Sequence, residues 1–352
     1  MIQNRGSRRT TMVMGLLVLA GICQVAWAGD LEPPGAPSPT TTAINETDPR
    51  SPIRSGDLPL NISAPGSYYL AEDISTAGFG ITISADNVTI DLMGFSLRGG
   101  TGNGISAADR MNLAVKNGSV SGWSASGISL ADGSNSIVSN VRAEGNGIYG
   151  IRVGEHGLVI NSTAQNNLGT GIYGEAGSTI IGCNAAFNLV GISAGFGSTV
   201  TNCSAMYNSA DGITATAATV SYSTATFNGD DGISVTAGGA VLNCTARSND
   251  GDGIVVLSGT SVVGNTCNSN GQAGGGAGIH VIQNYNRIEA NNVTFNNGPG
   301  FDVDMGGNII IKNTARGNLQ NYAQIVGGNA VGLVQAVSSN FTNTNAWANF
   351  SY

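Results

Sequence analysis

The sequence predicts an all-β parallel solenoid of about eleven coils, because two residue types and an apolar pair recur in one register. A Gly-Ile pair returns at intervals of 20 to 25 residues, and an Asn precedes most of its glycines by three or four positions. Each unit also carries an apolar pair five residues apart, such as Val200 and Ala205. Units of this kind cannot bury their own apolar face, so they must stack. The glycines of the most regular stretch are Gly150, Gly171, Gly191, Gly212, Gly232, Gly253, Gly278 and Gly300, the last followed by Phe301.

Residues 1–28 have the composition of an export signal. The basic residues Arg5, Arg8 and Arg9 precede an apolar centre and the small-residue cleavage pattern Ala26-Trp27-Ala28. We therefore expect export to the periplasm, the cell surface or the extracellular medium. Removal of this segment would change the net charge from −8 to −11, which argues against nucleic acid as a partner.

The remaining chain divides by composition and by period. Proline is absent between Gly66 and Gly298, as is typical of strands that pair on both sides. Two insertions, 271–277 and 317–330, interrupt the period and predict surface loops. We expect the aromatic residues Trp347, Phe350 and Tyr352 to cover the last coil. In order, the predicted segments are a Pro-rich tether (29–57), an N-terminal cap with the first coil (58–99), the parallel β-helix (100–315) and a last coil with a C-terminal cap (316–352).

Repeats such as Ser198-Thr199-Val200-Thr201-Asn202-Cys203-Ser204-Ala205, followed by Asn208 and Gly212-Ile213, resemble those of right-handed parallel β-helix proteins, the pectate-lyase-like superfamily. The resemblance covers roughly 58–352, and segments 29–37, 48–53 and 347–350 resemble exported bacterial β-helix proteins of unassigned activity. It implies a right-handed fold but no reaction, since this scaffold carries lyases, hydrolases, epimerases, adhesins and inert shafts. The hydrolase motifs Asn-Thr-Asp, Gly-His-Gly and Arg-Ile-Lys and the epimerase signature Tyr-Gly-x-Asp-Pro-His do not occur in the sequence.

Residues at equivalent positions of successive coils are expected to lie about 4.8 Å apart, and we call such a set a column. One column holds Asp211, Asp231 and Asp252, each directly before a glycine. Stacked carboxylates repel unless a cation, a proton or water compensates their charge. The column could therefore bind Ca²⁺ or provide a carboxylate pair for glycoside hydrolysis. Alternatively, Asp-Gly recurs because it is a favourable turn dipeptide.

The residue after each Gly-Ile pair is expected to point outward from the first strand of its coil. In this column His280 and Asp302 would lie one coil apart, within reach of a hydrogen bond that could prepare His280 as a catalytic base. Arg152 and Tyr173 belong to the same column, and Arg287 lies near the repeats, so all three are predicted substrate contacts. A surface His beside an Asp is also common without any catalytic role.

Three cysteines, Cys183, Cys203 and Cys244, share one column, which we expect to fill the inside of a turn. The sequence leaves a disulfide between Cys183 and Cys203 open, because export favours it and coil stacking opposes its geometry.

Two functions are consistent with the sequence. The first is an exported, monomeric β-helix that serves as a structural or carbohydrate-binding surface element, with polysaccharide as partner and no transmembrane span. The second is a polysaccharide-active enzyme, in the first instance a Ca²⁺-assisted lyase acting on an acidic glycan and less readily a glycoside hydrolase. The lyase would use His280 as base, the Asp211, Asp231 and Asp252 column for Ca²⁺, and Arg152 or Arg287 to contact substrate. The lack of an assembled catalytic set favours the first function.

Overall fold

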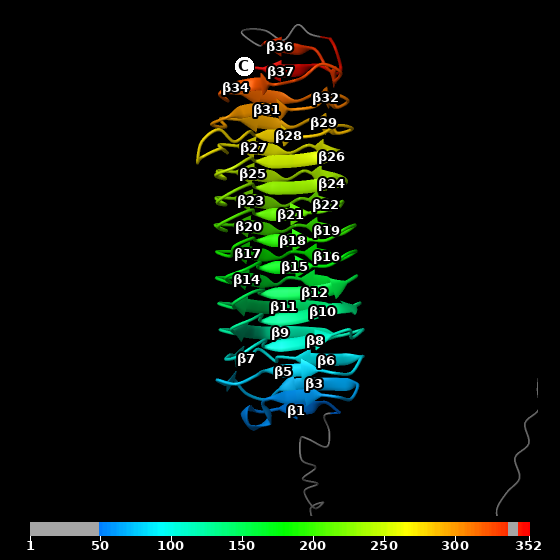
Figure 1. Ribbon diagram of the computed structural model, residues 1–352, viewed down its shortest axis with the longest axis vertical. Helices are drawn as coiled ribbons and strands as arrows, with labels where there is room; N and C mark the ends of the chain where they lie inside the picture. Colours follow the sequence, from blue (N-terminus) through cyan, green and yellow to red (C-terminus); the bar gives the residue numbers. More distant parts are fainter. Residues whose placement is uncertain (1–48, 337–343) are drawn as a thin grey trace, which may run out of the picture. The chain divides into compact units, whose positions relative to one another are not determined.

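The computed structural model describes residues 49–336 and 344–352, which form a long stack of parallel β-strands (Figure 1). The described residues are all-β, with about 13 turns of solenoid and about 1% helix. The short 3₁₀ helix η1 spans Ser55–Asp57. Among the described residues, no helix is long and apolar enough to cross a membrane. The predicted signal at 1–28 and residues 29–48 of the predicted tether lie outside the described residues.

Each complete coil contributes one strand to each of three parallel sheets, which we call the first, second and third sheets. The first sheet contains β2 (Leu60–Ile62), β5 (Ile81–Ile83), β8 (Ile105–Ala108), β10 (Ile128–Ser134), β12 (Ile151–Glu155), β15 (Ile172–Gly174), β18 (Ile192–Ala194), β21 (Ile213–Ala215), β24 (Ile233–Leu242), β26 (Ile254–Val263), β28 (Ile279–Val281), β31 (Pro299–Val303) and β34 (Gln320–Ala323). The second sheet contains β1 (Ser51–Ile53), β3 (Gly66–Leu70), β6 (Val88–Asp91), β9 (Ala114–Ser121), β11 (Ile137–Glu144), β13 (Leu158–Ile160), β16 (Thr179–Ile181), β19 (Thr199–Thr201), β22 (Thr219–Ser221), β29 (Arg287–Glu289), β32 (Ile309–Ile311) and β35 (Ala330–Val331), and the long strands β24 and β26 continue into it.

The third sheet contains β4 (Ile74–Ser75), β7 (Ser96–Arg98), β14 (Thr163–Gln165), β17 (Asn184–Ala186), β20 (Ser204–Met206), β23 (Thr224–Thr226), β25 (Thr245–Arg247), β27 (Thr266–Asn268), β30 (Asn292–Thr294), β33 (Thr314–Arg316), β37 (Asn349–Ser351) and β36 (Val334–Ala336). The long strands β9 and β11 continue into it from the second sheet. The three sheets enclose one apolar interior that runs along the stack.

The interior is filled by apolar residues from all three sheets of a coil. In the coil of β21, Ile213, Val220 and Ala225 of the first, second and third sheets are each 0% exposed, and Ala215 of the first sheet is 2% exposed. The predicted apolar pair five residues apart therefore supplies the second and third sheets, and the Ile of Gly-Ile supplies the first. Because every coil repeats this triad, each coil completes the core of its neighbours.

The glycine of each Gly-Ile pair marks a close approach between coils. A Cβ added at Gly212 would lie 2.7 Å from the Gly232 carbonyl oxygen and 2.6 Å from Asn228 Nδ2. Such a contact is too short for any side chain, so glycine is needed because the next coil occupies the space.

Buried asparagines join the coils at the turn between the third and first sheets. Each side-chain Nδ2 donates to the Oδ1 of the next Asn along the stack, over distances between 2.8 and 3.2 Å. Each backbone N–H also donates to that Oδ1, as Asn188 does to Asn208 at 3.0 Å. We call this set the asparagine ladder; its members are Asn146, Asn167, Asn188, Asn208, Asn228, Asn249, Asn270, Asn296 and Asn318.

The stack has about 13 turns, two more than the Gly-Ile pairs predict. The additional coils lie at the ends, where Pro59-Leu60 and Asn321-Tyr322 replace Gly-Ile. At the C-terminal end no further first-sheet strand follows β34 among the described residues. Position 321 therefore has no carbonyl oxygen of a following coil close to its Cβ, and a side chain such as that of Asn321 fits. The predicted insertion at 317–330 accordingly contains β34 rather than forming only a loop.

The N-terminal end of the stack begins inside the segment predicted as a tether. Ser51–Ile53 forms β1 and pairs in parallel with Tyr68–Leu70 of β3. Ile53 is 1% exposed and joins the interior. The expected boundary at residue 57 is therefore wrong for the described residues, because Ile53 and its backbone cover the first coil.

The C-terminal residues form a strand instead of the predicted aromatic cover. Strand β37 lies between β33 and β36 in the third sheet, so that Phe350 is in register with both Thr314 and Gln335. Strand pairing satisfies backbone groups that a loose cover would leave unpaired. Inside the stack, the Tyr322 ring lies 5.0 Å from the Phe301 ring at an interplanar angle of 9°.

The cysteine column fills the inside of a turn, as expected. Cys183 and Cys203 are buried free thiols, which answers the question of a disulfide. The Cys203 thiol donates to the Thr201 carbonyl oxygen at 3.2 Å. Burial also raises the pKa of the Cys244 thiol to about 11, so this thiol stays protonated at neutral pH.

Candidate functional site

The acidic column lies at the end of the turn that leads from the third sheet into the first sheet. Asp211 Oδ1 accepts the backbone N–H of Asp231 at 3.1 Å, and Asp231 Oδ1 accepts that of Asp252 at 2.7 Å. Asp252 Oδ1 accepts the N–H of Ala277, the next residue of the column, at 2.5 Å. These carboxylates therefore link successive turns, in agreement with the interpretation of Asp-Gly as a recurring turn element.

Burial raises the proton affinity of two of these carboxylates, Asp231 and Asp211. Desolvation raises the pKa of Asp231 to about 7; the hydrogen bond from Asp252 opposes this rise, and the charges of Asp252 and Asp211 add to it. Desolvation also raises the pKa of Asp211. Near neutral pH, Asp231 is consequently partly protonated.

The predicted Ca²⁺ ligands divide into two groups in the structure. Asp211 and Asp231 lie with Asp230, and their carboxylate oxygens are within 4.8 Å of one another. Asp252 instead directs its Oδ2 to His280 Nδ1, at 2.8 Å. Oxygen ligands suit Ca²⁺, so Asp211, Asp230 and Asp231 are the residues that could hold it at this corner.

His280 lies on β28 between two carboxylates. Its Nδ1 contacts Asp252 and its Nε2 contacts Asp304 Oδ2 at 3.1 Å. Asp302 is in register with His280 on β31, as predicted. However, both ring nitrogens are engaged elsewhere, so the expected hydrogen bond between His280 and Asp302 is replaced by these two contacts.

Asp302 faces the same cluster and has an unsatisfied oxygen. Its buried Oδ1 has no hydrogen-bond partner among the described residues. Burial raises the pKa of Asp302, while the charge of His280 opposes that rise. Ligand atoms of His280, Asp302 and Asp304 lie within 4.8 Å of one another, and the carboxylate oxygens of Asp302 and Asp304 are of the kind that binds Ca²⁺. Sequence reasoning missed Asp304, although Asp302 and Asp304 are two residues apart, the spacing that places side chains on one face of a strand.

The two carboxylates determine the charge of His280. The hydrogen bond to Asp252 raises the pKa of His280 to about 9; burial opposes the rise, and Asp304 adds to it. At neutral pH the ring is therefore an imidazolium, which can donate a proton but cannot accept one. A role as general base would require loss or neutralisation of these contacts.

Arg152 and Tyr173 form a second cluster on the first sheet. The Arg152 Nη2 and Nε groups donate to Glu175 Oε1 at 2.6 and 3.1 Å. The guanidinium carbon lies 5.7 Å from the centroids of both the Tyr149 and Tyr173 rings. Arg152 and His280 share a column but are separated by six strand-to-strand steps, roughly 29 Å. They cannot act on the same sugar unit.

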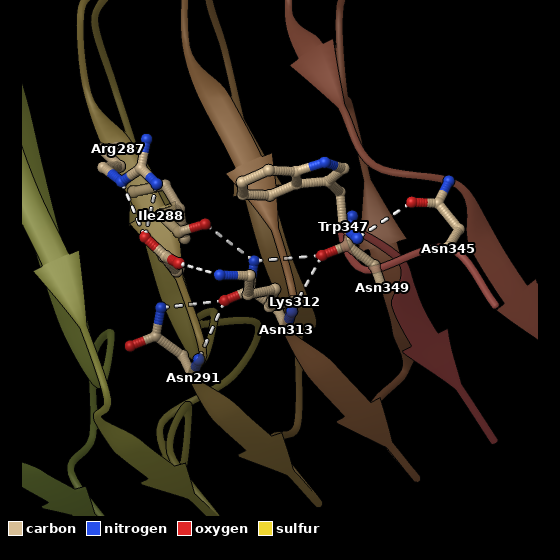
Figure 2. A network of polar contacts seen from close by, with 9 residues as sticks. Arg287, Ile288, Asn291, Lys312, Asn313, Asn345, Trp347 and Asn349 are labelled. Atoms are coloured by element: carbon tan, nitrogen blue, oxygen red, sulfur yellow. Dashed lines mark hydrogen bonds and ion pairs between the residues drawn. The ribbon is translucent and has the colours of Figure 1, made fainter.

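Arg287 lies on a different face. It belongs to β29 of the second sheet, and its Nε donates to Glu289 Oε2 at 2.7 Å. Glu289 Oε1 also accepts a hydrogen bond from Lys312 at 2.8 Å, and the Lys312 ammonium lies 4.7 Å from the Trp347 ring. Figure 2 shows this network beside the asparagines Asn291, Asn313 and Asn349. Arg287 is therefore remote from the outward face of the first sheet.

Sequence reasoning also missed an exposed aromatic stack of Phe187, Tyr207 and Phe227. Neighbouring ring centroids are 5.3 and 5.2 Å apart, and both interplanar angles are 6°. The signal was present in the sequence, since each ring directly precedes a member of the asparagine ladder at the period of the coils.

Comparisons with known proteins agree with the fold. Residues 153–267 match the family model described as a right handed beta helix region. The A-module of a mannuronan C-5 epimerase from Azotobacter vinelandii is similar in structure, with 15% identity, a TM-score of 0.47 and coverage of 73% of this chain and 91% of that chain. A periplasmic alginate epimerase gives 12% identity, a TM-score of 0.44 and coverage of 73% and 74%. A surface adhesin of Streptococcus pneumoniae has 9% identity and a TM-score of 0.40, with coverage of 72% of this chain and 77% of that chain. No significant sequence match to a curated protein was found. The resemblance to right-handed parallel β-helix proteins is thus confirmed.

Proposed function

We propose that this protein is an exported β-helix that binds a glycan along the outward face of its first sheet. The observation that carries the proposal is one column of side chains in continuous register from Arg152 on β12 to Asp302 on β31, of which all but Val255 are at least partly exposed. Seven strand-to-strand steps make this column roughly 34 Å long. A surface of that length suits an extended polymer. The export signal predicted at 1–28 supports a location outside the cytoplasm.

The chemistry of the column favours a polyhydroxylated ligand. Hydroxyl groups of Ser193, Thr214 and Ser234 occupy its middle, and each of these residues is half-buried. Hydroxyls both donate and accept hydrogen bonds, as sugar hydroxyls do. At one end the Tyr173 ring offers a flat apolar surface, which suits the face of a sugar ring.

The charges of the face favour a neutral glycan over an acidic one. Asp252, Asp302 and Asp304 surround the single cationic ring of His280, and the whole chain carries a net charge of −8. Arg152, the cation at the other end, already pairs with Glu175. An anionic sugar would therefore be repelled at the His280 end of this face.

The proposal is tested by two lysine substitutions in the same coil. Thr214 lies on β21 of the first sheet, and Thr219, equally half-buried, lies on β22 of the second sheet. Calorimetric titration would use the hexaoses of glucose (β-1,4 and α-1,4), mannose and xylose. We expect Thr214→Lys to weaken binding at least roughly tenfold, about 1.4 kcal/mol, and Thr219→Lys to leave it within twofold. Equal effects of the two variants, or no binding by any hexaose, would refute the proposal.

A second candidate function, a polysaccharide lyase acting on an acidic glycan, is favoured by the position of His280 between Asp252 and Asp304. Ca²⁺ held by Asp302 and Asp304 would offset the negative charge that keeps His280 protonated. The assay follows ultraviolet absorbance of unsaturated ends with acidic polysaccharides and Ca²⁺. Absorbance growth that His280→Ala abolishes would establish the lyase, whereas no growth across the panel would exclude it.

A further inference from the structure

The exposed aromatic stack occupies a single column at the outer side of the turn that carries the asparagine ladder. Phe187, Tyr207 and Phe227 follow β17, β20 and β23 directly, and they are 56%, 48% and 48% exposed. Their φ angles are 57°, 54° and 55°, so each residue has the same left-handed backbone. Three apolar rings are thus held in parallel in contact with solvent.

The stack is interrupted because two positions of the column carry small serine side chains, while the backbone conformation stays the same. The next two positions of the column are Ser248 and Ser269, with φ angles of 53° and 56°, and an aromatic residue returns at Phe295 with 55°. The backbone N–H of Ser248 donates to the next coil as that of Phe227 does. Phe227 and Phe295 are three coils apart, roughly 14 Å, and small serines lie between them.

A cavity of about 460 Å³ runs along the aromatic stack, from Phe187 and Tyr207 to Phe227 and Ser248 at the edge of this interruption. At this end of the cavity Phe227 provides an apolar ring, Ser248 adds a hydroxyl, and Asp250 and Gln272 add a carboxylate and an amide. Gln272 belongs to the 271–277 insertion, which projects beside β27 (Figure 1). The insertion therefore brings a polar group to the edge of the aromatic stack.

We infer that this interruption is a binding slot for one pyranose ring of a neutral glycan, which stacks on Phe227 as the next ring of the column. A pyranose has a flat face of C–H groups and a rim of hydroxyls, so it matches an aromatic surface bordered by Asp250 and Gln272. The carboxylate of Asp250 accepts hydrogen bonds from hydroxyls and repels anionic sugars and nucleic acid. The inference rests on the proposed carbohydrate binding, but the slot lies on the turn between the third and first sheets rather than on the face that contains Thr214.

The matched variants Ser248→Phe and Ser248→Ala test the slot. Ser248→Phe fills it with a protein ring, and the left-handed backbone at this position already holds phenylalanine in neighbouring coils. Ser248→Ala leaves the slot open, and Phe227→Ala removes its wall. Using the same hexaoses, we expect Ser248→Phe and Phe227→Ala each to weaken binding of at least one sugar roughly tenfold, with Ser248→Ala within twofold of wild type. Thermal unfolding of each variant confirms that the fold is retained.

Each other outcome overturns the inference. Unchanged binding in Ser248→Phe and Phe227→Ala would show that no sugar ring enters the slot. Equal losses of binding in Ser248→Phe and Ser248→Ala, or a lack of binding by every hexaose, would show the same. Wild-type self-association that disappears in Ser248→Phe, measured by sedimentation velocity, would show that a second copy fills it. Loss of binding in Thr214→Lys together with normal binding in Ser248→Phe would retain the proposed function and reject only the slot.

Discussion

At the scale of single residues, amides hold the coils together more directly than charges do. Asn208 is 2% exposed; its Oδ1 accepts the backbone N–H and the Nδ2 of Asn188, and its Nδ2 donates to Asn228 and to the Ala185 carbonyl. Every polar group of the side chain is thus satisfied in a buried setting. A buried donor that loses its partner costs about 1–3 kcal/mol, so the stack is sensitive to substitution in the ladder.

Asn208→Ala should therefore be strongly destabilising. The substitution leaves the N–H and Nδ2 of Asn188 without their acceptor, and we expect a loss of about 2–4 kcal/mol in the free energy of unfolding. Urea unfolding measures the loss. Asn184→Ala, which changes an exposed residue of β17, serves as the control and should stay within about 0.5 kcal/mol of wild type. Equal stabilities of the two variants would contradict the role of the ladder.

The charge of His280 can be observed directly, because the chain contains 2 histidines. Its folded pKa of about 9 lies above the ordinary value of 6.5, so the contacts with Asp252 and Asp304 stabilise the fold fully below about pH 6.5. This stabilisation is lost as the pH rises through about 9. Proton NMR should show one imidazole signal with a midpoint near pH 9, and His280→Gln should remove that signal. A midpoint near pH 6.5 for the signal that His280→Gln removes would mean that the two contacts do not form in solution.

At the scale of elements, each first-sheet strand begins where two coils approach most closely. The close contact of Gly212 with Gly232 and Asn228 links strand stacking to the asparagine ladder, since one added methyl group would disturb both. The Gly-Ile period is therefore a consequence of packing between coils and not of turn conformation.

Gly212→Ala should accordingly destabilise the fold by about 1–3 kcal/mol, the usual cost of overpacking. The matched control is Gly56→Ala in η1, where an added Cβ would meet no atom within 4 Å. Thermal unfolding of both variants gives the comparison. A Gly212→Ala protein as stable as the control would show that the coils can separate at little cost.

At the scale of the whole molecule, the regular period made the architecture predictable, whereas local departures from the period could not be predicted. Fixed coil length and strand alternation decide which side chains share a face, so the register of Arg152, Tyr173, His280 and Asp302 followed from counting. The contact between His280 and Asp252 depends instead on side-chain reach from a turn to the neighbouring coil, which no period encodes. The C-terminal end coil lacks the Gly-Ile signal because Asn321 is followed by no further first-sheet strand among the described residues.

The scale of the molecule also explains why the candidate sites remain separate. Columns place the Arg152 cluster, the His280 cluster and the aromatic stack along one rigid scaffold, but residues on different coils stay at fixed separations. A small substrate could meet only one cluster. A polymer could meet several, which favours a glycan chain as the ligand over a small substrate bound at one cluster.

The most direct test of that account is a crystal structure of the protein with the hexaose that binds best. We predict sugar density along the outward face of the first sheet, over Ser193, Thr214 and Ser234. Density confined to the second sheet, or to its Arg287 and Glu289 pair, would contradict the proposed binding face.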